Sequence, residues 1–248
     1  RRYLELFLDS SRRGHWDCVC IPNANPVANG GGGQLALALL KEFPEEAAEA
    51  LWYARRNIWN WLDYCTGFDG GNTEGVQYWQ YGTLNFLRFA RALERVLGHD
   101  DGLLSHPGIT KTMNMIRVAL SNHGMNDTIP LPVGAPIADF CAGRYGDAFA
   151  LWYADHCERA FRERLAAGKP GPYRSEPFWR LLARPAVPES FEPPALPEVF
   201  VLEDIHYGIL RSAPKHDCRL VAGLKGARAP YTHHNQPDTG AFFVHVRG

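Results

Sequence analysis

The sequence predicts an α+β protein in which a large helical part is followed by an antiparallel sheet. Apolar residues recur at helical spacing through the first two-thirds of the 248 residues. Prolines then gather from residue 185 onward, where they cannot continue a helix. Short alternating apolar runs follow the prolines and are typical of strands. We therefore expect a helical domain at residues 1–184, a Pro-rich linker at 185–197 and a sheet domain at 198–248.

The expected helices are separated by segments rich in glycine and proline. They cover residues 34–42, 44–64, 78–97, 109–120, 147–167 and 177–182. Pro44 suits the first turn of a helix, and Glu45 and Glu46 suit the positive end of the helix dipole. Long helices joined in pairs by Gly-rich loops favour antiparallel hairpins stacked in a ring or an array.

The expected strands are short and regularly placed. They cover Val199–Leu202, Tyr207–Arg211 and residues 218–224 and 241–246, and their alternation predicts antiparallel strands of a sandwich-type sheet. The chain opens at Arg1 in the pattern of a helix and closes in the last strand. We therefore expect an internal piece of a longer protein, with the sandwich truncated here.

Composition narrows the possible partners. A formal net charge of −1 provides no general field for nucleic acid or anionic lipid, so a local site would have to bind any anionic ligand. We expect no nucleic acid as a partner. No apolar run approaches the length of a bilayer span. The six cysteines match no zinc or redox spacing. We expect buried free thiols, with one disulfide as the alternative.

The densest group of proton-transfer residues lies just before the last strand. His233 and His234 are adjacent there and are followed by Gln236 and Asp238. Histidine exchanges protons near neutral pH, so this turn is a candidate for acid–base chemistry. The alternative is a structural histidine beside a turn. Gln236 and Asp238 also offer oxygen ligands for a metal, although Gln is a poor zinc ligand.

Two further segments carry candidate residues. Asn29 lies in a loop with four glycines before an Ala- and Leu-rich helix, where its amide can donate to a carboxylate or hydroxyl. Tyr78 and Tyr81 share one face at the start of a helix, whose dipole favours a phenolate. The alternatives are a flexible connection for the loop, and packing or sugar stacking for the tyrosines. Asn126 lies in a polar loop that we expect to border the same cleft.

Two carboxylates form another candidate pair. Asp69 and Glu74 lie five residues apart in a glycine-rich segment, where they are candidates for an acid and base of glycoside hydrolysis. The alternative is that they are turn and helix-start residues.

Three segments, in this order, resemble the heparinase II/III-like polysaccharide lyases. The first is Trp16-Asp17-Cys18-Val19-Cys20 leading to Asn29-Gly30-Gly31. The second is Glu74-Gly75-x-x-Tyr78-Trp79-x-Tyr81-Gly82. The third is His233-His234-Asn235-Gln236-Pro237-Asp238-Thr239-Gly240-Ala241-Phe242. The resemblance covers about residues 14–248 and implies an incomplete (α/α) toroid followed by an antiparallel β-sandwich.

The resemblance implies β-elimination of uronic-acid polysaccharides, such as alginate or glycosaminoglycans, by a periplasmic or secreted enzyme. Asn29 would neutralise the substrate carboxylate, which acidifies the proton on C5. Tyr81 would protonate the leaving oxygen. If the C5 proton lies on the same face of the sugar, Tyr81 would also act as the base. His234 would be the base or its partner. The implied substrate contacts are Tyr78, Glu74, Asn126, His233 and Gln236.

The chain departs from the family's pattern in two places. Gln236 stands where many members have a second histidine, so we expect no cofactor, and a structural metal near Asp238 is the alternative. The Asn-bearing loop also carries extra residues at 22–27. Two other functions stay open: a non-catalytic glycan-binding relative, and an (α/α)-toroid glycoside hydrolase that uses Asp69 and Glu74.

Overall fold

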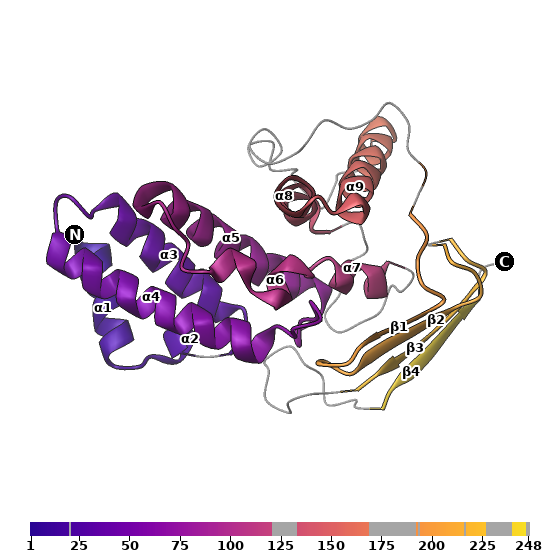
Figure 1. Cartoon of the computed structure of the whole chain (residues 1–248), viewed down its shortest axis with the longest axis horizontal. Coiled ribbons are helices and arrows are strands. Elements are labelled where there is room, and N and C mark those ends of the chain that lie inside the picture. The colour runs from indigo at the N-terminus through magenta and orange to yellow at the C-terminus, as the bar shows by residue number, and fades with distance from the viewer. Residues whose placement is uncertain are drawn as a thin grey trace.

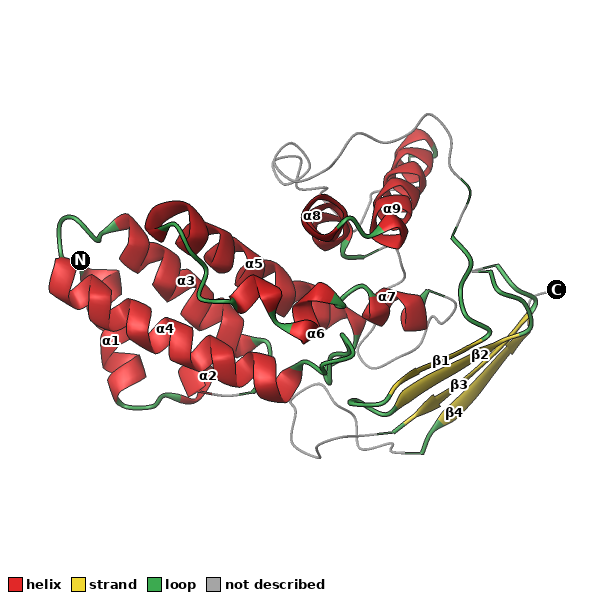
Figure 2. Cartoon of the chain, in the orientation of Figure 1, coloured by secondary structure: helices red, strands yellow, loops and turns green. Residues whose placement is uncertain are grey.

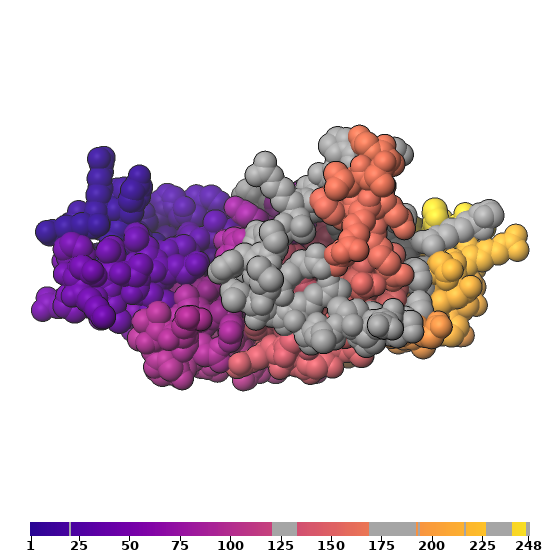
Figure 3. All heavy atoms as spheres, turned by 90° about the horizontal axis from the view of Figure 1, so that it is seen from above, coloured from indigo at the N-terminus to yellow at the C-terminus, as the bar shows by residue number. Residues whose placement is uncertain are grey.

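The computed structural model describes residues 1–19, 21–120, 133–168, 192, 194–215, 217–226 and 240–246. In these ranges the chain forms nine α-helices, one short 3-10 helix and four strands (Figure 1, Figure 2). The first helices lie at one end of the molecule, the strands at the other, and residues 148–166 between them (Figure 3). The predicted order of helices followed by an antiparallel sheet is confirmed.

The first helices form one bundle. It contains α1 (Arg2–Arg12), the single turn α2 (Trp16–Val19), α3 (Ala24–Ala38), α4 (Pro44–Cys65) and α5 (Val76–Leu97). The helix α3 packs against both α4 and α5 (Figure 1). The expected helices at residues 44–64 and 78–97 are confirmed as α4 and α5. Both hold long apolar stripes that are buried in the bundle.

The prediction of a loop over residues 15–34 is wrong, because α2 covers Trp16–Val19 and α3 begins at Ala24 and contains all four glycines. A Cβ at Gly33 would lie 2.3 Å from the Phe89 ring, and one at Gly32 would lie 2.5 Å from the Phe7 ring. The absent side chains therefore let α1 and α5 approach α3 closely. Glycine weakens an isolated helix by roughly 1 kcal/mol per residue, and packing on three sides overrides that preference here.

Short helices connect the bundle to the rest of the chain. They are η1 (Leu103–Ser105), α6 (Pro107–Thr110) and α7 (Asn114–Ala119). The prediction of one helix over 109–120 is wrong, since turns at residues 111–113 divide it. The helix α8 (Ala135–Tyr145) was not predicted. The expected helix at 147–167 is confirmed as α9 (Ala148–Ala166), and the one expected at 177–182 lies outside the described residues.

The sheet is antiparallel throughout. Its strands are β1 (Val199–Leu202), β2 (Tyr207–Arg211), β3 (Leu220–Lys225) and β4 (Phe242–Val246), hydrogen-bonded in that order. All four predicted strands are confirmed, with small differences at the ends of β3 and β4. Side chains from β1 and β2, including Leu202 and Tyr207, join the apolar core of the helices. This packing places the β1–β2 end of the sheet against the helical part.

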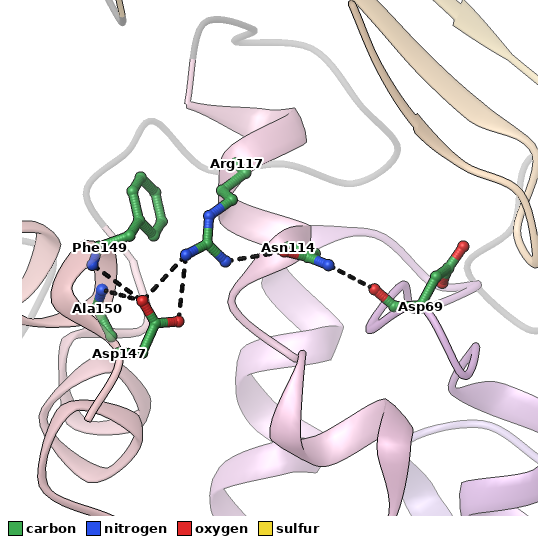
Figure 4. A network of polar contacts seen from close by, with 6 residues as sticks. All are labelled: Asp69, Asn114, Arg117, Asp147, Phe149 and Ala150. Carbon is green, nitrogen blue, oxygen red and sulfur yellow. Dashed lines mark hydrogen bonds and ion pairs between the residues drawn. The ribbon is translucent and has the colours of Figure 1, made fainter. Parts of the chain in front are cut away.

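A polar network centred on Arg117 of α7 links three parts of the chain (Figure 4). The Arg117 guanidinium donates to Asp147 at 3.0 Å and to Asn114 at 2.8 Å, and it lies 4.3 Å from the centre of the Phe149 ring. Asn114 in turn donates to the Asp69 carbonyl at 2.8 Å. Asp147 also caps α9. The network therefore ties the α4–α5 connection and α7 to the start of α9.

The turn between β1 and β2 is held against the same region. The backbone N–H of Asp69 donates to the Asp204 carboxylate at 3.2 Å, and the N–H of Asp204 donates to the Asp69 carboxylate at 3.0 Å. Arg211 of β2 donates to the carbonyls of Arg117 and Pro197. These contacts fix the sheet relative to α7 by hydrogen bonds as well as by apolar packing.

Among the described helices, none is long and apolar enough to cross a membrane. The five cysteines that the structure describes are buried and form no disulfide with one another. The described elements form a mixed helix-and-sheet protein, and the (α/α) toroid and the β-sandwich stay predictions. Only five residues of the expected linker at 185–197 belong to the described ranges.

Candidate functional site

The candidate site is built where α3 and α5 begin. Asn23 lies just before α3 and Glu74 just before α5, and both side chains are buried. The Glu74 carboxylate accepts hydrogen bonds from the Asn23 backbone N–H at 2.6 Å and from its side-chain amide at 2.8 Å. A Cβ at Gly82 of α5 would lie 3.3 Å from Asn23 and 3.3 Å from Pro26. The first turns of the two helices therefore pack side by side.

The two helices run in parallel. A Cβ at Gly30, four residues after Pro26 on α3, would lie 3.0 Å from the carbonyl oxygen of Asn85, three residues after Gly82 on α5. Both N-terminal ends therefore lie at the same end of the bundle. The exposed N–H groups of a helix start carry partial positive charge. This end of the bundle thus favours an anionic group.

Glu74 occupies an interior position, with 1% of its surface exposed. Burial raises its pKa to about 7, and the hydrogen bonds from Asn23 oppose that rise. The Cys65 thiol lies 3.8 Å from the carboxylate, and burial raises the pKa of this thiol as well. Glu74 was expected to contact substrate. In this structure its carboxylate contacts Asn23 and Cys65 and is shielded from solvent.

The tyrosines lie on the first two turns of α5. Tyr81 is 51% exposed, and Tyr78, one turn earlier, is half-buried. Trp79 between them is buried, and its indole N–H donates to the Thr112 hydroxyl at 2.7 Å. Tyr81 lies two residues after Trp79, on the opposite and exposed side of α5. Tyr81 is therefore a phenol that a ligand can reach, next in sequence to the contact between α5 and the start of α3.

Asn29 lies inside the bundle rather than on a loop. Its side chain is fully buried, and its amide donates to the Cys18 carbonyl at 2.8 Å and to the Asn25 carbonyl at 3.0 Å. Its oxygen accepts from the Asn57 amide at 3.1 Å. Both N–H groups are thus engaged. Its expected role as neutraliser of a substrate carboxylate stays a prediction, and it requires that one of these bonds be released.

Asn57 completes this amide network and was missed in the sequence. It donates to Asn29, and its carbonyl accepts from the Asn25 amide at 2.9 Å. The sequence pattern does indicate that Asn57 is buried, because Asn57 lies on the apolar stripe of α4. That stripe includes Ala50, Ala54 and Trp61, all of which are buried. A polar residue on an apolar stripe must find hydrogen-bond partners inside the protein. That argument predicts a buried amide partner, although not its identity.

The carboxylates of Asp69 and Glu74 were the candidate pair for hydrolysis. The Asp69 carboxylate accepts from the backbone N–H groups of Gly71 and Asp204, both at 3.0 Å. The Glu74 carboxylate accepts from Asn23. Both groups therefore act as turn and helix-start residues, which is the alternative that the sequence left open for them.

His106 illustrates a structural histidine. It is buried against Phe68 and Trp59, with ring centroids 5.3 Å and 5.9 Å away, and its Nδ1 accepts from the Gly108 N–H at 3.1 Å. Burial lowers its pKa, and Asp63 opposes this effect. The ring therefore caps α6 in its neutral form.

The other candidate residues lie outside the described residues. These are His233, His234, Gln236 and Asn126, together with Asp238. Within the described ranges, no group of three or more His, Cys, Asp or Glu side chains is arranged to hold a metal ion. Of the expected catalytic residues, the structure therefore places Asn29 and Tyr81.

No known family model matches the chain, and no curated protein matches it.

Proposed function

We propose that this protein cleaves an acidic, uronate-containing polysaccharide by β-elimination. The exposure of Tyr81 carries the proposal: its phenol is open to a ligand at the end of the bundle where two helices begin in parallel. That end favours negative charge, because two sets of N-terminal N–H groups meet there. A uronate carboxylate, and the charge that develops on it during proton abstraction, match this environment.

Tyr81 would serve as the acid in this reaction. The C4–O bond of the substrate breaks as the C5 proton is removed, and the leaving oxygen takes a proton from the phenol. General acid catalysis of this kind typically contributes 10²- to 10⁴-fold to a rate. The base would be His234 or Tyr81 itself, which the family resemblance implies.

Asn29, unlike Tyr81, is already hydrogen-bonded inside the bundle. Both of its N–H groups donate to backbone carbonyls, so binding a substrate carboxylate requires that it give up one of them. Substitution of Asn29 would therefore disturb helix packing as well as substrate binding. Tyr81 is the better residue to test, because its hydroxyl group can be removed by substitution with Phe without disturbing the packing of the core.

A non-catalytic glycan-binding protein is the second candidate, because the buried amide network also allows a structural role for Asn29. Hydrolysis has less support, since Glu74 is buried and the Asp69 carboxylate accepts two backbone N–H groups. Elimination and hydrolysis have different products. Elimination creates an unsaturated uronate that absorbs in the near ultraviolet, whereas hydrolysis creates only a new reducing end.

The test is a panel of uronate polysaccharides incubated with the protein and with Tyr81→Phe, followed by ultraviolet absorbance and by an assay for reducing ends. We expect at least one polymer to gain absorbance, and Tyr81→Phe to slow this gain by roughly 10²-fold or more. Tyr3→Phe is the matched control, because Tyr3 is an exposed tyrosine on α1.

Three outcomes would contradict the proposal. Elimination that survives Tyr81→Phe removes this tyrosine from the mechanism. Reducing ends without absorbance indicate hydrolysis. Binding of a polymer without any cleavage favours the glycan-binding function.

A further inference from the structure

Four hydrogen-bond contacts hold the side chain of Asn29 between α3 and α4. Its two N–H groups have three acceptors within reach, which are the Cys18 carbonyl at 2.8 Å and the backbone and side-chain oxygens of Asn25 at 3.0 Å and 3.1 Å. Its oxygen accepts from the Asn57 amide of α4 at 3.1 Å. Acceptors for the N–H groups are therefore in surplus, whereas the oxygen has one donor within the part of the chain that the structure describes.

The surplus of acceptors indicates which hydrogen bond a substrate carboxylate can replace. Asn25 lies one turn before Asn29 on the same helix, so its two oxygens remain beside the Asn29 amide. Cys18 belongs to the single turn α2, in which Trp16 and Val19 are 53% and 45% exposed. The turn α2 therefore lies between the Asn29 amide and the outside of the bundle. A ligand that displaces it would meet the N–H that now donates to Cys18.

The bond from Asn57 gains importance once that N–H is released. The Asn29 side chain is then held by Asn25 on one side and by the buried Asn57 amide on the other. Donation to an amide oxygen also polarises the amide, which strengthens the hydrogen bonds that its own N–H groups donate. Without Asn57, the buried Asn29 oxygen would lose its donor, and an unpaired buried acceptor favours rotation of the side chain toward other partners.

We propose that Asn57 is a positioning residue for the elimination reaction, an inference that rests on the proposed function. Asn57 holds Asn29 by its oxygen, so that the N–H released by Cys18 points at the substrate carboxylate. Negative charge develops on this carboxylate as the C5 proton leaves, and a fixed, polarised donor stabilises that charge better than a donor that is free to turn. Asn57 itself touches no substrate in this role, because it is buried and its amide donates to Asn29.

A double-mutant cycle separates positioning from a general loss of stability. Asn57→Ala removes the donor but keeps the Asn57 carbonyl, which accepts from the Asn25 amide at 2.9 Å and links α3 to α4. On the uronate polymer that the unmodified protein cleaves fastest, we expect Asn57→Ala to lower kcat by roughly 10- to 100-fold. In an Asn29→Ala background the same substitution should change kcat by less than about threefold, because the residue through which Asn57 acts is absent. Asn60→Ala is the matched control, since Asn60 is a half-buried asparagine of the same helix, and it should leave kcat unchanged in both backgrounds.

Nuclear magnetic resonance provides a second measurement that needs no substrate. The side-chain NH2 signals of Asn29 are identified by their loss in Asn29→Ala. In Asn57→Ala these signals should shift, and their exchange with water should become roughly 10-fold faster. In Asn60→Ala they should stay unchanged. Asn57→Leu is close to Asn in size and suits the apolar stripe of α4, so it replaces Asn57→Ala if that variant fails to fold, as checked by circular dichroism.

Several results would overturn the role of Asn57 and leave the proposed elimination standing. These are an unchanged kcat in Asn57→Ala or in Asn29→Ala, and an equal effect of Asn57→Ala with and without the Asn29 side chain. Unchanged Asn29 signals in Asn57→Ala would have the same meaning, and these signals decide the question if Asn29→Ala is too slow for the cycle. If the unmodified protein eliminates none of the polymers, both the proposed function and the role of Asn57 are wrong.

Discussion

At the scale of single residues, Glu74 and Glu49 show how surroundings set the charge of a carboxyl group. The pKa of Glu49 is lowered, chiefly by a hydrogen bond from Arg12 at the surface. The pKa of Glu74 is raised to about 7, because burial disfavours the carboxylate more than Asn23 favours it. The same residue type thus serves as a surface anion in one place and as an interior group that titrates near neutral pH in the other.

The raised pKa of Glu74 predicts an unusual dependence of stability on pH. The unfolded chain releases the Glu74 proton near pH 4.5, whereas the folded protein holds it up to about pH 7. The contribution of Glu74 to the free energy of unfolding is therefore complete below pH 4.5 and is lost as the pH rises through 7. The difference amounts to about 3 kcal/mol. Glu74→Gln should remove this dependence, as measured by urea unfolding at a series of pH values.

Glu163→Gln on the exposed surface of α9 is the control for this experiment. It should keep the pH dependence of the unmodified protein. If the difference in unfolding free energy between Glu74→Gln and the unmodified protein is the same at pH 4.5 and pH 8, Glu74 is not a buried titrating group.

At the scale of elements, α3 shows how packing can replace helix propensity. Its glycines would break an isolated helix, but Gly33 lies directly beneath the Phe89 ring of α5. Gly31 has a different position on the same helix. It is exposed, and a Cβ there would have no neighbour within 4 Å. At Gly31 glycine only lowers helix propensity, whereas at Gly33 it also allows close packing against α5.

Alanine substitutions at these two glycines should have opposite effects. Gly33→Ala forces the new methyl group against Phe89 and should lower the free energy of unfolding by about 1–3 kcal/mol. Gly31→Ala adds helix propensity without a clash and should raise it by about 0.5–1 kcal/mol. Thermal and urea unfolding measure both. Equal effects of the two substitutions would mean that the close approach of α3 to α5 is not what requires glycine.

At the scale of the whole molecule, Arg117 holds the start of α9 on the helical part. Its guanidinium is half-buried between the Asp147 carboxylate and the Phe149 ring (Figure 4). Hydrogen bonds to a charged group contribute about 1.5–3 kcal/mol. The packing of α9 therefore depends on a polar contact as well as on its apolar stripe.

Loss of the Arg117 side chain should loosen α9. We expect Arg117→Ala to lower the free energy of unfolding by about 2 kcal/mol, and to speed hydrogen exchange in α9 more than in α4. Arg162→Ala is the control, because Arg162 forms an exposed pair with Glu158 on α9 itself. Such surface pairs contribute about 0–1 kcal/mol. Equal exchange rates in α9 for the two variants would show that the Arg117 network does not hold this helix.

Elements with long, uninterrupted periodicity could be predicted from the sequence alone. The helices α4, α5 and α9 belong to this class, because their apolar residues repeat at the spacing of their buried faces. The four strands could be predicted as short apolar runs separated by turn residues. The wrong predictions concern segments in which the local conformational preference of the sequence disagrees with the tertiary packing. The glycines of α3 indicate a loop until Phe89 and Phe7 are placed beside them, and α8 was missed altogether.

For the candidate site, too, some properties follow from the sequence and others only from the tertiary structure. The sequence by itself determined which residue types are present, that Tyr78 and Tyr81 share a helix face, and that Glu74 precedes that helix. Only the tertiary structure decided that Tyr81 is exposed while Glu74 and Asn29 are buried. Exposure depends on which helices pack together, and such contacts join residues far apart in the chain, such as Asn23 and Glu74, which lie 51 positions apart. Helical spacing depends only on near neighbours in the chain, whereas desolvation and hydrogen-bond partners depend on the whole fold.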